Sequence, residues 1–157
     1  MYCTDYQLLA EQMRSLAESE RDFVPLLSNV SALLYDALDR INWVGFYLMD
    51  RGSLLLGPFQ GKVACIRIEI GKGVCGTAVR EDRIVRVDDV HAFSGHIACD
   101  AASVSEIVVP IRQGKTILGV LDIDSPVKGR FDEMDEAGLE ELAKQLAEVA
   151  DFSRLRR

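Results

Sequence analysis

Residues 105–124, SEIVVPIRQGKTILGVLDID, contain two apolar runs on either side of a short polar segment. Both runs are rich in Val and Ile, whose branched side chains fit the pleated surface of a strand. The segment Gln113–Lys115 has a central Gly, which suits a tight turn between antiparallel strands. The stretch therefore predicts a β-hairpin, and with it an antiparallel sheet.

The register of this hairpin decides where its acidic residues lie. A three-residue turn pairs Arg112 with Thr116 and places Glu106 directly opposite Asp122. Asp122 and Asp124 are two residues apart, so both side chains project from the same face of the sheet. The hairpin therefore predicts three carboxylates on one patch, whereas a two-residue turn would shift the register by one and disrupt the patch.

Helical and strand patterns surround the hairpin. Apolar residues recur at helical spacing in residues 5–18, in residues 21–39 and in the segment DEMDEAGLEELAKQLAEVADF. Further strands are predicted at residues 42–50, in SLLLGPF, at residues 63–70 and in RIVRVDDV, with a short helix in VCGTAVRED. This order predicts an α+β fold: a central antiparallel sheet with N- and C-terminal helices on one face and a ligand pocket on the other.

A chain of 157 residues is most simply a single domain, residues 1–157. We expect the N-terminal helices in residues 1–40, the sheet and the active-site loops in residues 41–126, and the C-terminal helix in residues 131–153. The pocket is expected beneath the long loop at residues 88–102.

Composition excludes several classes of protein. The formal net charge of −7 argues against non-specific binding to nucleic acid. No stretch approaches the roughly 18 apolar residues of a membrane span. The N-terminus, MYCTDYQLLAEQ, lacks the basic start and apolar centre of a signal peptide. We therefore expect a cytoplasmic protein that binds neither nucleic acid nor a membrane.

The predicted carboxylate patch raises an electrostatic problem. Like charges placed opposite each other destabilise a sheet, and clustered acids respond by sharing a proton or by binding a cation. A solvated sheet face is one interpretation, but Val108, Val109 and Val120 indicate a buried hairpin, where unpaired acids are costly. The patch then requires a metal ion or a ligand ammonium group. Asp and Glu alone would suit Mg²⁺ or Ca²⁺, whereas the nearby thiol of Cys99 favours an organic ligand.

An aromatic strand supplies a second candidate feature. In NWVGFYL, Trp43, Gly45 and Tyr47 share one strand face, and the intervening apolar residues share the other and indicate core. Trp43 and Tyr47 either pack as ordinary core residues or line a cavity against a small apolar group.

The chain has four cysteines, Cys3, Cys65, Cys75 and Cys99. In a reducing compartment they are not structural disulfides by default, and the CxxC spacing of a structural zinc site does not occur. Each is either a small buried hydrophobe or a reactive thiol. Cys99 lies in a polar loop, three residues after His96, so it is reachable and His96 could help to ionise it.

Six motifs form a specific combination: NWVGFYL, LGPFQGKVACIRI, GKGVCGTA, HIACD, SEIVVPI and GVLDIDSP. This combination resembles the free methionine-(R)-sulfoxide reductases, a GAF-domain family, over residues 42–132. One departure is Val63, where the family has Pro in a GKPAC motif, and this residue touches no reacting group. The resemblance implies a single GAF-like domain that uses no cofactor and no metal.

By this resemblance, the chain reduces free L-methionine (R)-sulfoxide to methionine. Cys99 in HIACD resembles the nucleophile, which attacks the sulfoxide sulfur and becomes a sulfenic acid. Cys65 in VACIRI resembles the resolving cysteine that closes a disulfide with Cys99, and Cys75 in GVCG resembles an auxiliary or alternative resolver. A thioredoxin-like reductant would regenerate the thiols. The implied substrate-binding residues are Trp43, Tyr47, Glu106, Asp122 and Asp124.

The acids then acquire separate expected roles. Glu106 or Asp122, kept protonated by its neighbours, would hydrogen-bond the sulfoxide oxygen, and Asp124 would bind the substrate ammonium group. Trp43 and Tyr47 would pack around the S-methyl end of the substrate.

Two other classes of function fit parts of the sequence. A GAF-like domain can be a non-catalytic sensor of a small ligand, such as a cyclic nucleotide. The acid cluster could instead be the metal site of a hydrolase, in which the cysteines would be incidental. Helices near both ends of the chain could also pair two subunits as a homodimer.

Overall fold

The computed structural model describes residues 3–95 and 102–157, which form one six-stranded antiparallel sheet in the order β3-β2-β1-β6-β5-β4. The strands are β1 (Trp43–Asp50), β2 (Ser53–Gly61), β3 (Arg67–Ile68), β4 (Val85–Val87), β5 (Ser105–Gln113) and β6 (Thr116–Ser125). The helices are α1 (Tyr6–Ser19), α2 (Phe23–Ala37), α3 (Gly73–Glu81) and α4 (Glu133–Val149), with a 3₁₀ turn, η1, at Val90–Ala92.

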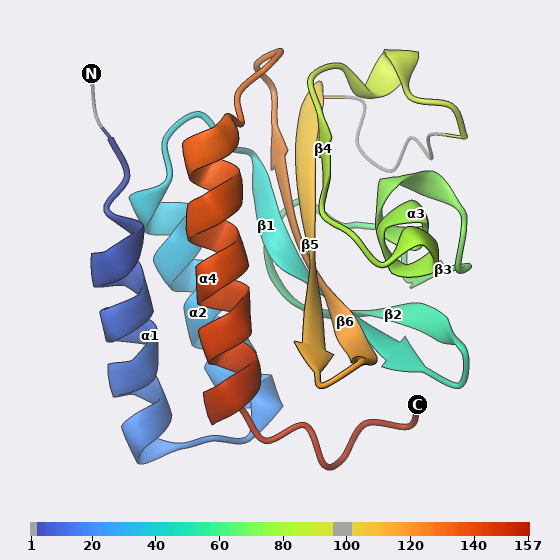
Figure 1. Ribbon diagram of the computed structural model, residues 1–157. Coiled ribbons are helices and arrows are strands. Elements are labelled where there is room, and N and C mark those ends of the chain that lie inside the picture. The colour runs from blue at the N-terminus through green and yellow to red at the C-terminus, as the bar shows by residue number, and fades with distance from the viewer. Residues whose placement is uncertain (1–2, 96–101) are drawn as a thin grey trace.

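The helices divide between the two faces of the sheet. Figure 1 shows α1, α2 and α4 on one face and α3 on the other. α4 packs against both α1 and β5, which makes the first face the main core. The predicted α+β architecture is confirmed. None of the helices in the described part of the chain combines the length and apolar character needed to cross a membrane.

Alternation along the central strands builds an apolar layer on each side of the sheet. The layer beneath α1, α2 and α4 includes Phe46, Ile107, Val109, Leu121 and Ile123. The layer beneath α3 includes Trp43, Tyr47, Val108 and Val120. Because strand side chains alternate with a period of two, the even-numbered acids of β5 and β6 face α3.

The β5–β6 hairpin differs from its predicted register. Gln113 pairs with Thr116, so the turn has two residues rather than three. Glu106 lies opposite Asp124, and the prediction that it lies opposite Asp122 was wrong. Sequence alone does not distinguish the two turn lengths here, because Gly114 can adopt the positive φ of +61° that the shorter turn requires.

A β-bulge compensates for the shorter turn. Arg112 pairs with Ile117, whereas Ile111 pairs with Gly119, so Leu118 has no partner on β5. A one-residue shift moves all later side chains of a strand to the opposite face, and the extra residue of a bulge reverses that shift. The three carboxylates therefore share one face, as predicted, although the pairing that led to this prediction was wrong.

The predicted strand at residues 63–70 is much shorter than expected. Only Arg67–Ile68 pairs with β2. The backbone that precedes β3 forms a hydrogen bond with a side chain of β1 instead. The Cys65 carbonyl accepts from the Tyr47 hydroxyl at 2.8 Å. This segment is therefore a fixed loop at the edge of the sheet.

β4 and α4 are also shorter than predicted. RIVRVDDV pairs only over Val85–Val87, because the Asp89 carboxylate accepts from the His91 backbone N–H and starts η1. The helix predicted over residues 131–153 begins only after Asp132, whose side chain and that of Asp135 form a reciprocal capping box.

Tyr6 holds α1 against α4. Its hydroxyl donates to the Asp135 carboxylate at 2.6 Å, and Arg130 donates to the other oxygen of that carboxylate at 3.0 Å. The Tyr6 ring lies directly on Gly138, where an added Cβ would overlap it. The absence of a side chain at Gly138 therefore permits the close approach of the two helices.

Replacing Gly138 with Ala should lower the free energy of unfolding by about 1–3 kcal/mol, the usual cost of overpacking. The expected sign is opposite to that of helix propensity, by which Ala stabilises a helix interior by about 1 kcal/mol relative to Gly. Denaturant titration followed by circular dichroism measures the change. In a Tyr6→Ala background the same substitution should no longer destabilise. A higher unfolding midpoint for Gly138→Ala in the otherwise unchanged protein would contradict the prediction.

Candidate active site

Side chains of the three central strands meet beneath α3 in one pocket. Trp43 and Tyr47 come from β1, Glu106 comes from β5, and Asp122 and Asp124 come from β6. All five side chains predicted to bind substrate therefore line the same pocket. The remaining lining residues are Val63, Ala64, Ile68, Lys72, Gly73, Val74, Cys75 and Ser103.

Trp43 is the centre of an aromatic wall. Its ring stacks on Tyr47 and Phe59 with centroid distances of 5.9 and 5.2 Å, and its indole N–H donates to the Lys62 carbonyl at 3.1 Å. A Cβ at Gly45 would overlap Phe59 and would come within 2.8 Å of Trp43. The absence of a side chain at Gly45 is therefore needed for the stack.

The acids on the pocket floor are buried. Glu106 and Asp122 expose only 8% and 5% of their surface. Burial, followed by the negative charges of Asp122 and Asp124, raises the pKa of Glu106 well above its usual range. Burial also raises the pKa of Asp122, although hydrogen bonds from Glu106 and Cys75 oppose this change. Glu106 is therefore the neutral proton holder and Asp122 the hydrogen-bond acceptor.

One carboxylate oxygen on the pocket floor lacks a hydrogen-bond donor. Asp122 Oδ1 is buried without a hydrogen-bond partner among residues 3–95 and 102–157. Over the same residues, neither Glu106 nor Asp122 forms an ion pair with a Lys or Arg side chain. A buried carboxylate oxygen without a partner is costly, so a ligand that brings a positively charged donor would be stabilised here.

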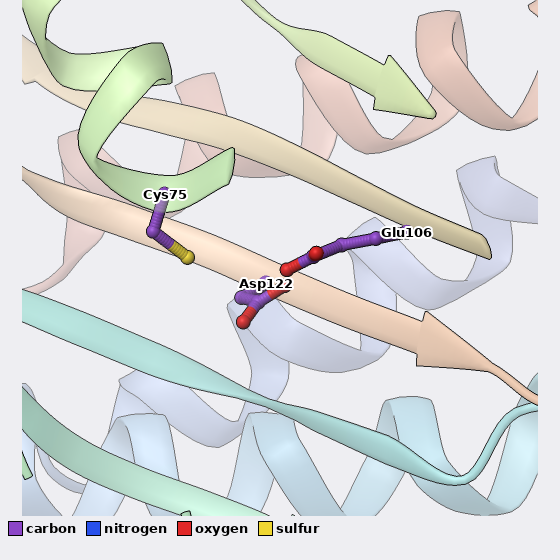
Figure 2. Close-up of side chains that lie close together, drawn as sticks. All are labelled: Cys75, Glu106 and Asp122. Carbon is purple, nitrogen blue, oxygen red and sulfur yellow. The ribbon is translucent and has the colours of Figure 1, made fainter. Parts of the chain in front are cut away.

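Cys75 projects from α3, and its side chain points toward Glu106 and Asp122 (Figure 2). Its sulfur and one carboxyl oxygen of each of Glu106 and Asp122 lie within 4.8 Å of one another. Burial and the neighbouring carboxylates raise the pKa of the Cys75 thiol, so the group is a neutral hydrogen-bond donor to Asp122. A thiol does not suit Mg²⁺ or Ca²⁺, which take oxygen ligands. The donor set therefore argues against the metal ions that the acids alone would favour.

The predicted resolving cysteine lies beside the pocket. Cys65 packs against the apolar layer beneath α3 and is disulfide-bonded, whereas Cys3 and Cys75 are free thiols. Burial raises the pKa of Tyr47 well above its usual range, so its hydroxyl stays protonated and donates to the Cys65 carbonyl. The predicted nucleophile, Cys99, and its neighbour His96 lie outside the described residues.

Sequence reasoning missed two polar residues of the pocket. Lys72 is the one basic side chain among its described lining residues, and it precedes α3 between two glycines of positive φ. A lysine between two glycines gives no periodic signal, although a cation in the same pocket as three acids suits a zwitterionic ligand. Ser103 accepts a hydrogen bond from the Asn42 side-chain amide at 3.3 Å, and no sequence signal indicated its position.

Comparison with known proteins agrees with this geometry. The GAF domain family model matches residues 26–150. The chain belongs to the GAF-domain family. This GAF domain is 55% identical over 144 residues to the free methionine-R-sulfoxide reductase of Escherichia coli, which covers 92% of this chain and 87% of that protein.

A second relative carries the same name. The GAF domain is 49% identical over 146 residues to the free methionine-R-sulfoxide reductase of Saccharomyces cerevisiae, covering 87% and 81% of the two chains. Among solved structures, that of fRMsr of Staphylococcus aureus in complex with substrate superimposes with a TM-score of 0.90 at 55% identity, covering 96% and 99%. The resemblance inferred from the six motifs is confirmed.

Proposed function

We propose that this GAF domain reduces free L-methionine (R)-sulfoxide to methionine. The observation that carries the proposal is the buried acid cluster, in which Asp122 Oδ1 lacks a partner beneath an aromatic wall. The identity of 55% to an enzyme with this name supports the same conclusion. A free amino acid brings an ammonium group, whereas a methionine residue within a protein does not.

The pocket offers a different surface to each part of such a substrate. Asp122 and Asp124 would accept hydrogen bonds from the ammonium group, and the stacked rings of Trp43 and Tyr47 would contact the S-methyl end. Glu106, which burial keeps protonated, would redirect its hydrogen bond from Asp122 to the sulfoxide oxygen when the substrate ammonium group takes its place on Asp122. A proton held at this position favours release of the oxygen from sulfur.

The redox steps use the cysteines in sequence. The Cys99 thiolate attacks the sulfoxide sulfur, the oxygen passes to Cys99 as a sulfenic acid, and methionine leaves. The Cys65 thiol then condenses with the sulfenic acid, which forms a disulfide and releases water. A thioredoxin-like dithiol reduces the disulfide to two thiols and is itself oxidised.

The states of the other thiols support Cys65 as the resolver. Cys65 is disulfide-bonded, whereas Cys75 is a buried, free thiol that hydrogen-bonds to Asp122. We therefore assign Cys75 to the pocket floor, with resolution of the sulfenic acid as its auxiliary role.

Incubation with separated substrates tests the proposed function. With dithiothreitol present, the R epimer of free methionine sulfoxide should yield methionine at least about 100-fold faster than the S epimer or a peptide-bound sulfoxide, because both alternatives lose contacts that fix the reacting sulfur. Methionine is counted by chromatography. Equal turnover of the peptide form would show that the acids do not select the ammonium group. Saturable binding of a ligand without any methionine formation would favour the non-catalytic sensor.

A further inference from the structure

Two apolar side chains beside Cys65 face solvent. Val63 and Ile66 are 89% and 71% exposed, the highest values for large apolar side chains in the described part of the chain. Single exposed apolar residues are common on protein surfaces. Two such residues on either side of a disulfide-bonded cysteine form a distinct surface, which we call the Cys65 patch.

The Cys65 patch is held in place by backbone hydrogen bonds. The Lys62 carbonyl accepts from the Trp43 indole at 3.1 Å, and the Cys65 carbonyl accepts from the Tyr47 hydroxyl at 2.8 Å. The Ile66 carbonyl accepts from the Leu56 backbone N–H at 2.8 Å. These three hydrogen bonds, within five residues of the chain, hold the carbonyls against β1 and β2, so the loop that displays the apolar side chains is fixed.

The charges around the patch differ from those of the whole chain. Among residues 3–95 and 102–157, the exposed charged side chains close in sequence to the patch are Lys62, Arg67 and Glu69, and Lys72 lines the same pocket as Val63. Arg67 is paired with the Asp50 carboxylate at 3.0 Å, so among these described residues the charge is that of Lys62 and Lys72 against Glu69. The chain as a whole carries a formal charge of −7. A partner that presents an apolar surface bordered by acidic residues is therefore complementary to this region.

We propose that the Cys65 patch is the docking surface for the dithiol protein that reduces the enzyme. This inference rests on the proposed function, which requires such a reductant. A thiolate must come within bonding distance of the disulfide sulfur that it attacks. A protein that reaches the sulfur of Cys65 therefore covers the side chains next to it, and the burial of Val63 and Ile66 stabilises the encounter.

Docking at this surface selects Cys65 as the sulfur that is attacked. The partner's thiolate bonds to Cys65 and displaces Cys99 as a thiolate, which takes up a proton. The partner's second thiol then attacks the mixed disulfide and releases Cys65 as a thiol. Two electrons pass from the partner dithiol to the enzyme disulfide, and the partner ends as a disulfide.

The substitution Ile66→Asp tests the proposal, because Ile66 does not line the pocket. Initial rates are measured with free methionine (R)-sulfoxide and either dithiothreitol or thioredoxin, the latter recycled by thioredoxin reductase and NADPH. Loss of one buried apolar contact should lower kcat/KM for thioredoxin by at least about tenfold. The rate with dithiothreitol, which needs no docking surface, should stay unchanged. The matched control is Met134→Asp, because Met134 is 64% exposed on α4.

Each outcome decides between the two proposals. A tenfold loss of kcat/KM for thioredoxin in Ile66→Asp, with no change in the rate with dithiothreitol and none in Met134→Asp, supports the docking surface. The variant Ile66→Gln should then show a smaller loss of kcat/KM for thioredoxin. An unchanged kcat/KM for thioredoxin in Ile66→Asp overturns the docking surface while leaving the reductase activity in place. No methionine from the unsubstituted protein with dithiothreitol would instead overturn the proposed function.

Discussion

Cys99→Ser should abolish reduction of free methionine (R)-sulfoxide, with a loss of about 10³-fold or more in kcat. A serine hydroxyl is not ionised near neutral pH and is a poor nucleophile toward sulfur, whereas a cysteine thiol can supply a thiolate. The prediction rests on the HIACD motif, since Cys99 is not among the described residues. The rate of methionine release with dithiothreitol measures the effect.

Two further thiols serve as controls for this substitution. Cys3→Ser should retain full activity, because Cys3 is exposed and lies outside every motif. Cys65→Ser should still release about one equivalent of methionine per enzyme but should lose recycling by thioredoxin. Multiple turnovers by Cys99→Ser would show that another cysteine is the nucleophile, and the proposed sequence of redox steps would then be wrong.

Glu106→Gln should change activity and stability in opposite directions. The Gln amide cannot transfer a proton to the sulfoxide oxygen, so kcat/KM should fall by about 100-fold or more, the usual contribution of a positioned acid. The same substitution removes a buried carboxyl group whose ionisation is costly beside Asp122 and Asp124. The variant should therefore unfold at a higher temperature than the unsubstituted protein at neutral pH.

The pH dependence of that stability gain follows from the direction of the pKa shift. The pKa of Glu106 is raised in the folded state, so its contribution to stability is full below its ordinary pKa of 4.5 and is lost as the pH rises toward the folded-state pKa. Gln has no proton to lose. The difference in melting temperature should thus grow as the pH is raised from about 4.5, as measured by calorimetry.

A matched substitution outside the pocket controls for the loss of one charge. Glu140→Gln removes a carboxylate that is exposed on α4, and it should alter neither kcat/KM nor the slope of stability against pH. If Glu106→Gln kept full activity, or if its stability difference did not vary with pH, the acid would have no role as a buried proton holder.

The sequence predicted the architecture more reliably than the pairing of individual residues. The patterns are strong in β1, β5, β6 and the flanking helices, because each helix buries one face and each central strand is buried on both faces. The edge segments before β3 and after β4 carry similar apolar patterns but form loops. Their backbones bond to the Tyr47 hydroxyl and to Asp89, and such local bonds cannot be recognised from apolar periodicity.

The same distinction applies to the pocket. The alternation of side chains on β1, β5 and β6 was sufficient to place Trp43, Tyr47 and the three acids on one face. The positions of Lys72 and Ser103 depend instead on how α3 and the chain before β5 fold over the sheet. Those contacts join segments that are distant in sequence, and no periodic pattern encodes them.

The unpaired Leu118 also constrains how this hairpin can change in length during evolution. A deletion of one residue that leaves the bulge in place would turn Asp122 and Asp124 into the apolar layer beneath α4, whereas a deletion of the bulged residue itself would keep the pairing of Glu106 with Asp124. Within the paired residues 119–123, insertions and deletions in related sequences should therefore occur in even numbers. A change of one residue can be accommodated at the bulge or in the turn.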